Sequence, residues 1–134
     1  MSETHELTDL QVAVMQVLWE SPGATAQDVR AALEADHRRE LAPTTVATLL
    51  TRLEKRGLIE HETIGRQYAY RARVSAEDIR GSMVRGLADR LFGGDVAQLV
   101  SHFLAEHEVA EGDLVKVREM IAAKERELKK KRKR

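Results

Sequence analysis

The chain has 134 residues, no cysteine and a formal net charge of zero, and 43% of its residues are hydrophobic but only 4% aromatic. This length fits one ordinary domain, or a small domain with a helical appendage, and the lack of cysteine excludes disulfides, thiol redox sensors and Cys-ligated metal sites. The polar, acidic first residues do not fit a signal peptide and no apolar run reaches the roughly 20 residues of a membrane span, so we expect a cytoplasmic protein without membrane insertion.

Two helices are predicted in the first third of the chain. Thr8 and Gln11 have the spacing of a capping box, in which each side chain bonds the backbone N–H of the other residue. The helix that follows should end at Ser21-Pro22-Gly23, because this triplet is typical of a turn. Thr25 is a good N-cap for a second, short helix that ends near Ala35.

A third helix is expected from about Pro43 to Arg56. Proline suits the first helical position and Gly57 suits a C-cap, so both ends carry a local signal. The apolar residues of the segment recur at helical spacing and should form one narrow buried stripe: Val46, Leu49, Leu50 and Leu53.

The opposite face of this third helix is rich in threonines and cations. Its members are Thr44, Thr48, Thr51 and Lys55, with Thr45 and Arg52 on the flanks. Threonine is a weak helix former, but its hydroxyl can bond base edges or phosphates and its methyl can contact a thymine methyl. Arg52 could bond guanine or phosphate, and Lys55 and Arg56 could hold the DNA backbone. The pattern favours DNA recognition, with a face that meets only solvent as the alternative.

A β-hairpin should follow the third helix. Residues 58–62 and 67–71 have strand character, and Gly65-Arg66 is the expected turn. Three helices followed by a hairpin is the order of a winged helix-turn-helix. Arg66 at the hairpin tip and Tyr68 beside it are candidates for phosphate or minor-groove contact. Because Tyr68 and Tyr70 share one face of the strand, we expect at least one of them to be structural.

The charges are unevenly distributed along the chain. Residues 1–36 contain one arginine against seven acidic residues, whereas residues 37–73 contain eight basic and four acidic residues. Arg38 and Arg39 could contact phosphate at the start of the third helix, or could lie in a solvated loop. The entirely basic tail, residues 129–134, is expected to be disordered, and whether it binds DNA is left open.

Three further helices are predicted after the hairpin: one opening at Ser75, one capped by Asp95, and one over about residues 112–128. Their apolar residues are too many for short helices to bury alone, so pairing with a second copy is expected, with packing back onto the first domain as the alternative. The predicted dimerisation residues are Ile79, Met83, Leu87, Leu91, Leu99, Phe103, Leu114, Val117 and Ile121. The expected domains are therefore a winged helix over 1–74 and a helical dimerisation region over 75–128.

No catalytic constellation is apparent in the sequence. The five histidines are scattered, and there is no Gly-rich phosphate loop or Ser-His-Asp set. We therefore expect no enzymatic activity, no cofactor and no metal site. The alternative to a sequence-specific DNA-binding protein is a winged-helix protein-interaction module, whose partner binding would be insensitive to salt.

Three parts of the chain together match a known pattern: Leu7–Gln11 with Val14-Met15 and Leu18-Trp19, Thr44–Leu53 with Lys55–Ile59, and Gly65–Tyr70. In these segments the chain resembles the penicillinase-repressor family of bacterial transcription factors (the BlaI/MecI/CopY group). The resemblance implies a transcriptional repressor that binds a palindromic operator as a homodimer, with the N-terminal domain on DNA and the C-terminal helices at the dimer interface. The copper-sensing branch of the family uses C-terminal cysteines, which this chain lacks.

Some members of that family are inactivated by proteolysis within the dimerisation region, triggered by a membrane metalloprotease that senses β-lactam. The segment Leu99–Phe103 is similar to the cleaved region, and the bond between His102 and Phe103 is the counterpart of the cleaved bond. The resemblance thus implies a membrane metalloprotease sensor as a candidate partner.

Overall fold

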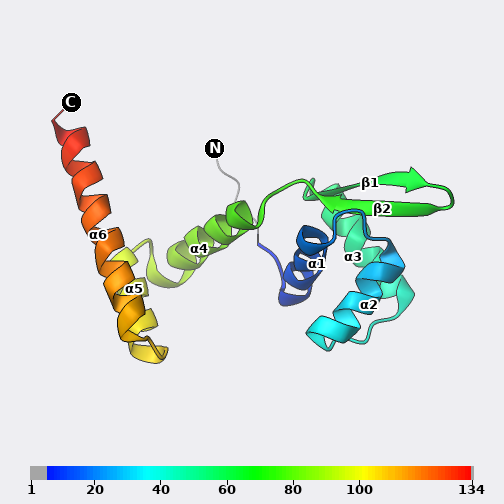
Figure 1. Cartoon of the computed structure of the whole chain (residues 1–134), viewed down its shortest axis with the longest axis horizontal. Coiled ribbons are helices and arrows are strands. Elements are labelled where there is room, and N and C mark those ends of the chain that lie inside the picture. The colour runs from blue at the N-terminus through cyan, green and yellow to red at the C-terminus, as the bar shows by residue number, and fades with distance from the viewer. Residues whose placement is uncertain (1–5, 134) are drawn as a thin grey trace. The chain divides into compact units, whose positions relative to one another are not determined.

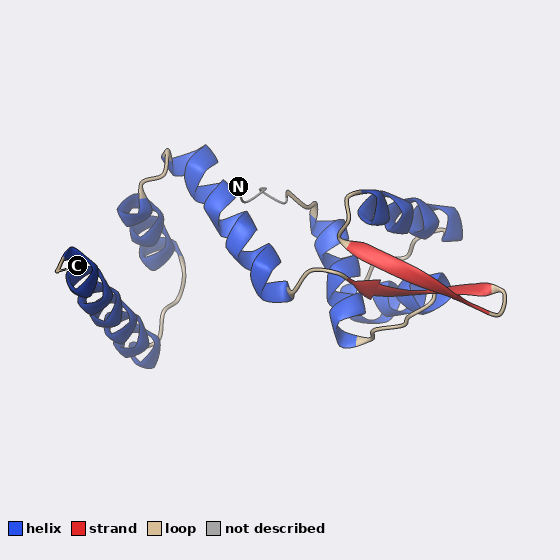
Figure 2. Ribbon diagram, turned by 90° about the horizontal axis from the view of Figure 1, so that it is seen from above, coloured by secondary structure: helices blue, strands red, loops and turns tan. Residues whose placement is uncertain are grey.

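The computed structural model describes residues 6–133, which form six helices and one two-stranded sheet in the predicted order (Figures 1 and 2). The elements are α1 (Asp9–Glu20), α2 (Ala26–His37), α3 (Pro43–Lys55), β1 (Ile59–Ile64), β2 (Gln67–Ala72), α4 (Ala76–Phe92), α5 (Val96–Glu106) and α6 (Glu111–Arg132). This order confirms the predicted fold class, a winged helix-turn-helix followed by a helical region. The chain divides after Leu91 into two compact units.

Reciprocal side-chain caps fix where α1 and α2 begin. The Gln11 N–H donates to Thr8 Oγ1 at 3.1 Å, and the Thr8 N–H donates to Gln11 Oε1 at 3.0 Å. Thr25 and Asp28 form the same pair of bonds, at 3.1 and 3.0 Å, before α2. These bonds satisfy backbone donors that a helix start leaves unpaired, which confirms both predicted helix starts.

The core of the first unit is aliphatic and is shared by the three N-terminal helices and the base of the hairpin. Ten of its apolar residues are at most 1% exposed: Val14, Met15, Leu18, Val29, Leu33, Val46, Leu50, Leu53, Leu58 and Ile59. Val46, Leu50 and Leu53 come from the stripe predicted on the third helix, whereas Leu49 is only partly buried. The stripe therefore fixes which face of α3 points outward.

The hairpin, whose strands are red in Figure 2, is closed by a two-residue turn. Ile64 lies opposite Gln67, so the turn consists of Gly65 and Arg66, as predicted. Gly65 has a φ of +64°, a conformation that costs little for glycine and much more for a residue with a Cβ.

The base of the hairpin is tied to the loop between α1 and α2. The Tyr70 N–H donates to the Ala24 carbonyl and the Gly23 N–H donates to the Tyr70 carbonyl, each at 2.8 Å. The indole N–H of Trp19, in the last turn of α1, donates to the Val74 carbonyl at 2.9 Å. These bonds hold the hairpin in a defined position against the helices.

The first half of α4 completes the core of the winged helix. Ile79 is only 2% exposed within that core, and Met83 packs against it. Both were expected in a dimer seam, and the expected domain boundary after residue 74 differs from the observed division after Leu91. The regular spacing of Ile79, Met83, Leu87 and Leu91 places them on one face of α4. Only the first half of that face, with Ile79 and Met83, covers the core.

The second unit consists chiefly of α5 and α6, and none of its described residues is buried. Gly93 and Gly94, both with positive φ, separate it from α4, and Asp95 caps α5 by accepting from the Gln98 N–H at 3.1 Å. Helix α6 runs to Arg132, so the tail expected to be disordered continues the helix through that residue. None of the helices described in residues 6–133 is both long and apolar enough to cross a membrane.

Candidate nucleic-acid interface

The outer face of α3 is open to solvent along its whole length. Every residue predicted there is exposed: Thr44, Thr45, Thr48, Thr51, Arg52, Lys55 and Arg56. The buried residues of the same helix lie on its opposite side. A helix that is anchored by one apolar stripe and bears hydroxyls, methyls and cations on the other side has the shape and chemistry that a major groove admits.

One hydrogen bond restricts what Thr48 can recognise. Its hydroxyl donates to the Thr44 carbonyl at 3.0 Å, one turn earlier in α3. The hydroxyl proton is therefore in use, and the Thr48 oxygen presents lone pairs together with the methyl group. Such a side chain can accept from the amino group of adenine or cytosine, or contact a thymine methyl.

The loop before α3 is held by Arg30, a residue that the sequence did not single out. The Arg30 Nε–H donates to the Leu41 carbonyl at 2.8 Å, and Pro43 opens α3 with no side-chain cap before it. Arg38 closes α2 in a left-handed conformation with φ of 54°, and the Arg39 N–H donates to the Leu33 carbonyl at 2.9 Å. The side chains of Arg38 and Arg39 are exposed, as phosphate contacts require.

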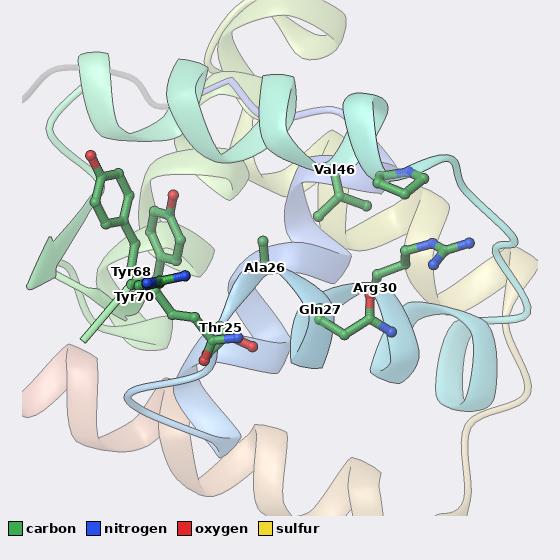
Figure 3. Close-up of a pocket in the computed structure, with 10 residues that line it drawn as sticks. Thr25, Ala26, Gln27, Arg30, Val46, Tyr68 and Tyr70 are labelled. Atoms are coloured by element: carbon green, nitrogen blue, oxygen red, sulfur yellow. The ribbon is translucent and has the colours of Figure 1, made fainter. Parts of the chain in front are cut away.

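An open pocket of about 510 Å³ lies between the first turns of α2 and α3 and the hairpin (Figure 3). Gln27 and Arg30 project from α2, and Tyr68 and Tyr70 lie next to each other on the hairpin side. Arg66 and Gln67 also line it. Two guanidinium groups and two amides give this pocket the donors to hold a phosphate oxygen. Arg30 and Gln27 could have been suggested by their place in the first helix of a helix-turn-helix, which crosses the DNA backbone.

The two tyrosines of the wing differ in environment. Tyr70 is 9% exposed and belongs to the core, whereas Tyr68 is 49% exposed and Arg66 is exposed at the tip. Burial raises the pKa of the Tyr70 hydroxyl above its ordinary value, and the negative charge of Glu54 raises it further. Tyr70 is thus a neutral structural residue, whereas the side chains of Tyr68 and Arg66 are exposed enough for a ligand to reach.

A further cluster connects α3 to the wing. The Nδ1 atom of His61 lies 2.7 Å from both carboxylate oxygens of Glu54, and its ring stacks on Tyr68 with centroids 4.0 Å apart. With Thr51 and Lys55, these side chains line a shallow groove of about 280 Å³. Glu54 therefore places a carboxylate beside Thr51 and Lys55, two predicted DNA contacts, and His61 pairs with that carboxylate. Sequence reasoning missed this cluster because seven residues and a change of element separate Glu54 from His61.

Two arginines of the basic middle segment have partners on the hairpin itself. Arg71 Nε lies 2.7 Å and Arg73 Nε 3.7 Å from carboxylate oxygens of Glu60. The hydrogen bond and charge of Glu60 raise the pKa of Arg71. These two cations therefore contribute less to an external field than their number suggests.

The predicted dimerisation residues beyond the core of the first unit remain accessible. Leu87, Leu91, Phe103, Leu114 and Ile121 are exposed, and Leu99 and Val117 are partly buried. Phe103 stacks on His107 with centroids 4.4 Å apart, and His102 lies beside Phe92. Helices that carry this much exposed apolar surface are typical of an interaction interface.

Within the described residues, no three His, Asp or Glu side chains gather in a way that could hold a metal ion.

A family model and two curated relatives indicate one family. A family model described as penicillinase repressor matches residues 7–123. The methicillin resistance regulatory protein MecI of Mammaliicoccus sciuri is 24% identical over 92% of this chain and 98% of that protein. The penicillinase repressor of Staphylococcus aureus is 24% identical over 87% of this chain and 90% of that protein. The solved complex structure of hsRosR-S4 is similar in fold, with a TM-score of 0.54 at 20% identity, over 93% of this chain and 95% of that chain.

Proposed function

Because the chain belongs to the penicillinase repressor family, we propose that it is a transcriptional repressor that binds a palindromic operator as a homodimer and with sequence specificity. Its relatives from Mammaliicoccus sciuri and Staphylococcus aureus are named as a resistance regulator and a penicillinase repressor. We assign no enzymatic activity and no cofactor to it.

The observation that carries this proposal is the exposed threonine and cation face of α3. Thr48 and Thr51 lie on the side opposite the buried leucines and Arg52 flanks them, so all three can reach base edges when the helix enters a major groove. Lys55 and Arg56 follow at the end of the helix and are suited to the adjacent phosphates. Arg66 and Tyr68 on the wing extend the contact along the backbone.

The exposed apolar surface of the second unit supports the proposed dimer. Residues such as Val96, Phe103, Met120 and Ile121 are half or more exposed, which is costly for a single copy in water. Pairing of two copies through α5 and α6 removes this surface from water. The two-fold symmetry of a dimer then presents two α3 helices to two half-sites spaced by about one helical turn or a multiple of it.

Gel-shift selection on genomic fragments, followed by anisotropy titration of the selected duplex, tests the proposal. We expect Arg52→Ala to weaken operator binding by about 5- to 150-fold, the range for one good base contact, and to leave binding to a scrambled duplex much less affected. Arg80→Ala, which removes an exposed cation from α4, is the matched control and should change neither. Equal losses on operator and scrambled DNA would rule out base recognition by Arg52.

The salt dependence of binding separates the repressor from a protein-interaction module. Phosphate contacts release counterions, so operator affinity should fall steeply as salt rises. A partner bound with little dependence on salt, together with no duplex binding, would favour the interaction module.

Release of the operator by cleavage in α5 completes the proposal. The bond between His102 and Phe103 lies inside this helix, none of whose residues is buried, so local unfolding of α5 is enough to expose the bond. Co-expression with a membrane metalloprotease sensor of the family, with inducing β-lactam, should yield fragments 1–102 and 103–134 by mass spectrometry. An intact chain under those conditions would exclude this route of release.

A further inference from the structure

The last eleven residues of the sequence, 124–134, lie beyond the family match and have an unusual charge. This basic segment holds eight of the 22 Lys and Arg residues and only two of the 22 acidic residues. The preceding 123 residues therefore contain fourteen basic and twenty acidic residues, a net charge of −6. These 123 residues, the acidic body of the chain, are repelled from DNA at long range. The positive charge of the basic segment reduces this repulsion.

The described part of the basic segment is helical. Helix α6 continues to Arg132, and Glu127 lies 3.8 Å from Lys124 Nζ and 3.9 Å from Lys131 Nζ. A glutamate four residues before a lysine supports a helix, and cations at its carboxyl end interact favourably with its dipole. The cations are thus displayed along a helix.

The apolar seam of α6 stops where the run of cations begins. Leu128 is the last apolar residue, and Lys129–Lys133, all exposed, cover more than one full turn of 3.6 residues. Cations therefore point to every side of this last turn. Such a turn cannot extend an apolar dimer seam, and it lacks the apolar face that would bury a helix in a membrane interface.

We propose that the basic segment is a second DNA-binding surface, which holds duplex phosphates without regard to sequence. This inference rests on the proposed function and adds to it a separate, purely electrostatic contact. Lysine and arginine bond phosphate oxygens whatever the neighbouring base, so this surface raises the affinity for any duplex and carries no sequence information. It also counteracts the repulsion between the acidic body and DNA during encounter.

Anisotropy titration of the full chain against a scrambled 30-base-pair duplex over a range of KCl concentrations tests the inference. The test variant replaces the six cations 129–134 by glutamine, which keeps a high helix propensity. Removal of one lysine–phosphate or arginine–phosphate bond should make the slope of log affinity against log salt shallower by about 0.9, and should weaken binding roughly eightfold at 0.1 M salt. Circular dichroism checks that the variant stays folded.

A matched pair of double variants isolates position from charge. Lys130→Gln/Lys131→Gln and Lys116→Gln/Arg118→Gln each remove two exposed cations from α6. Only the first pair should reduce the slope. Equal effects of both pairs, or an unchanged slope in the six-residue variant, would overturn the inference.

Two further arms separate this inference from other outcomes. If the unmodified chain binds operator and scrambled duplex equally, the proposed function is contradicted. The slope of affinity against salt still tests the inference in that case. Tight binding to phosphatidylglycerol vesicles, abolished in the six-residue variant while its DNA slope is unchanged, would assign the surface to membranes instead and overturn the inference.

Discussion

At the scale of single residues, the contact between His61 and Glu54 has a consequence for DNA binding. The imidazole lies 2.7 Å from both carboxylate oxygens, in a groove that also contains Thr51 and Lys55. Without the ring, the carboxylate of Glu54 would lose this hydrogen-bonding partner and be free to turn toward the side chains proposed to meet DNA. A negative charge a few ångströms from a phosphate costs on the order of 1 kcal/mol when water is near.

We therefore expect His61→Ala to weaken binding to any duplex by about three- to tenfold, because the carboxylate of Glu54, no longer held by the ring, can approach phosphates and repel them irrespective of sequence. Adding Glu54→Gln should restore most of the affinity, and Glu54→Gln alone should not weaken binding. Anisotropy titration of the three variants measures this. If the double variant binds no better than His61→Ala, the ring acts only by packing on Tyr68.

At the scale of elements, the caps of α1 and α2 are separable contributions to stability. Replacing the Thr25 side chain by alanine removes the acceptor for the Asp28 N–H. We expect Thr25→Ala to lower the free energy of unfolding by about 1 kcal/mol. Urea denaturation followed by circular dichroism measures the change.

The control for the cap is another threonine-to-alanine change on an exposed helical position. Thr45→Ala lies on the outer face of α3, where alanine has the higher helix propensity, so stability should stay the same or rise slightly. A Thr25→Ala protein as stable as Thr45→Ala would show that the cap contributes nothing measurable.

The elements predicted well are those with local signals. Thr8 and Thr25 mark helix starts through bonds to residues three positions away, and Gly65 marks a turn through its own backbone freedom. The end of α2 had no such signal, because Arg38 adopts a left-handed conformation that usually selects glycine. Helix α6 runs to Arg132, past the end predicted near residue 128, because the added residues are good helix formers and Glu127 pairs with Lys131.

The site was predictable only where one helix could be considered alone. The periodicity of α3 separated its buried leucines from its exposed threonines and cations. In contrast, the Arg30 bond to Leu41 and the His61 contact with Glu54 join different parts of the chain, as does the packing of Ile79 in the core. Spacing in the sequence does not encode such contacts.

At the scale of the whole molecule, the proposed repressor requires two copies of the chain. Ile121, 52% exposed on α6, belongs to the predicted seam. We expect Ile121→Glu to shift the protein from dimer to monomer at micromolar concentration, because pairing would bury an unpaired charge. Operator affinity should fall with it, since one half-site then binds without the other.

Ala123→Glu is the control, because it adds the same charge on the opposite side of α6 at an exposed position. Light scattering after size exclusion distinguishes the states. A monomeric unmodified chain, or equal effects of both variants, would contradict dimerisation through this face.

The outward face of α3, together with the wing, is the surface that we expect to meet the operator. Amide chemical-shift mapping of the isotope-labelled protein, titrated with the selected operator duplex, tests this most directly. We predict the largest shifts at residues 43–56 and at the hairpin tip, residues 64–68. Operator binding that leaves the α3 amides unchanged and perturbs another surface would contradict it.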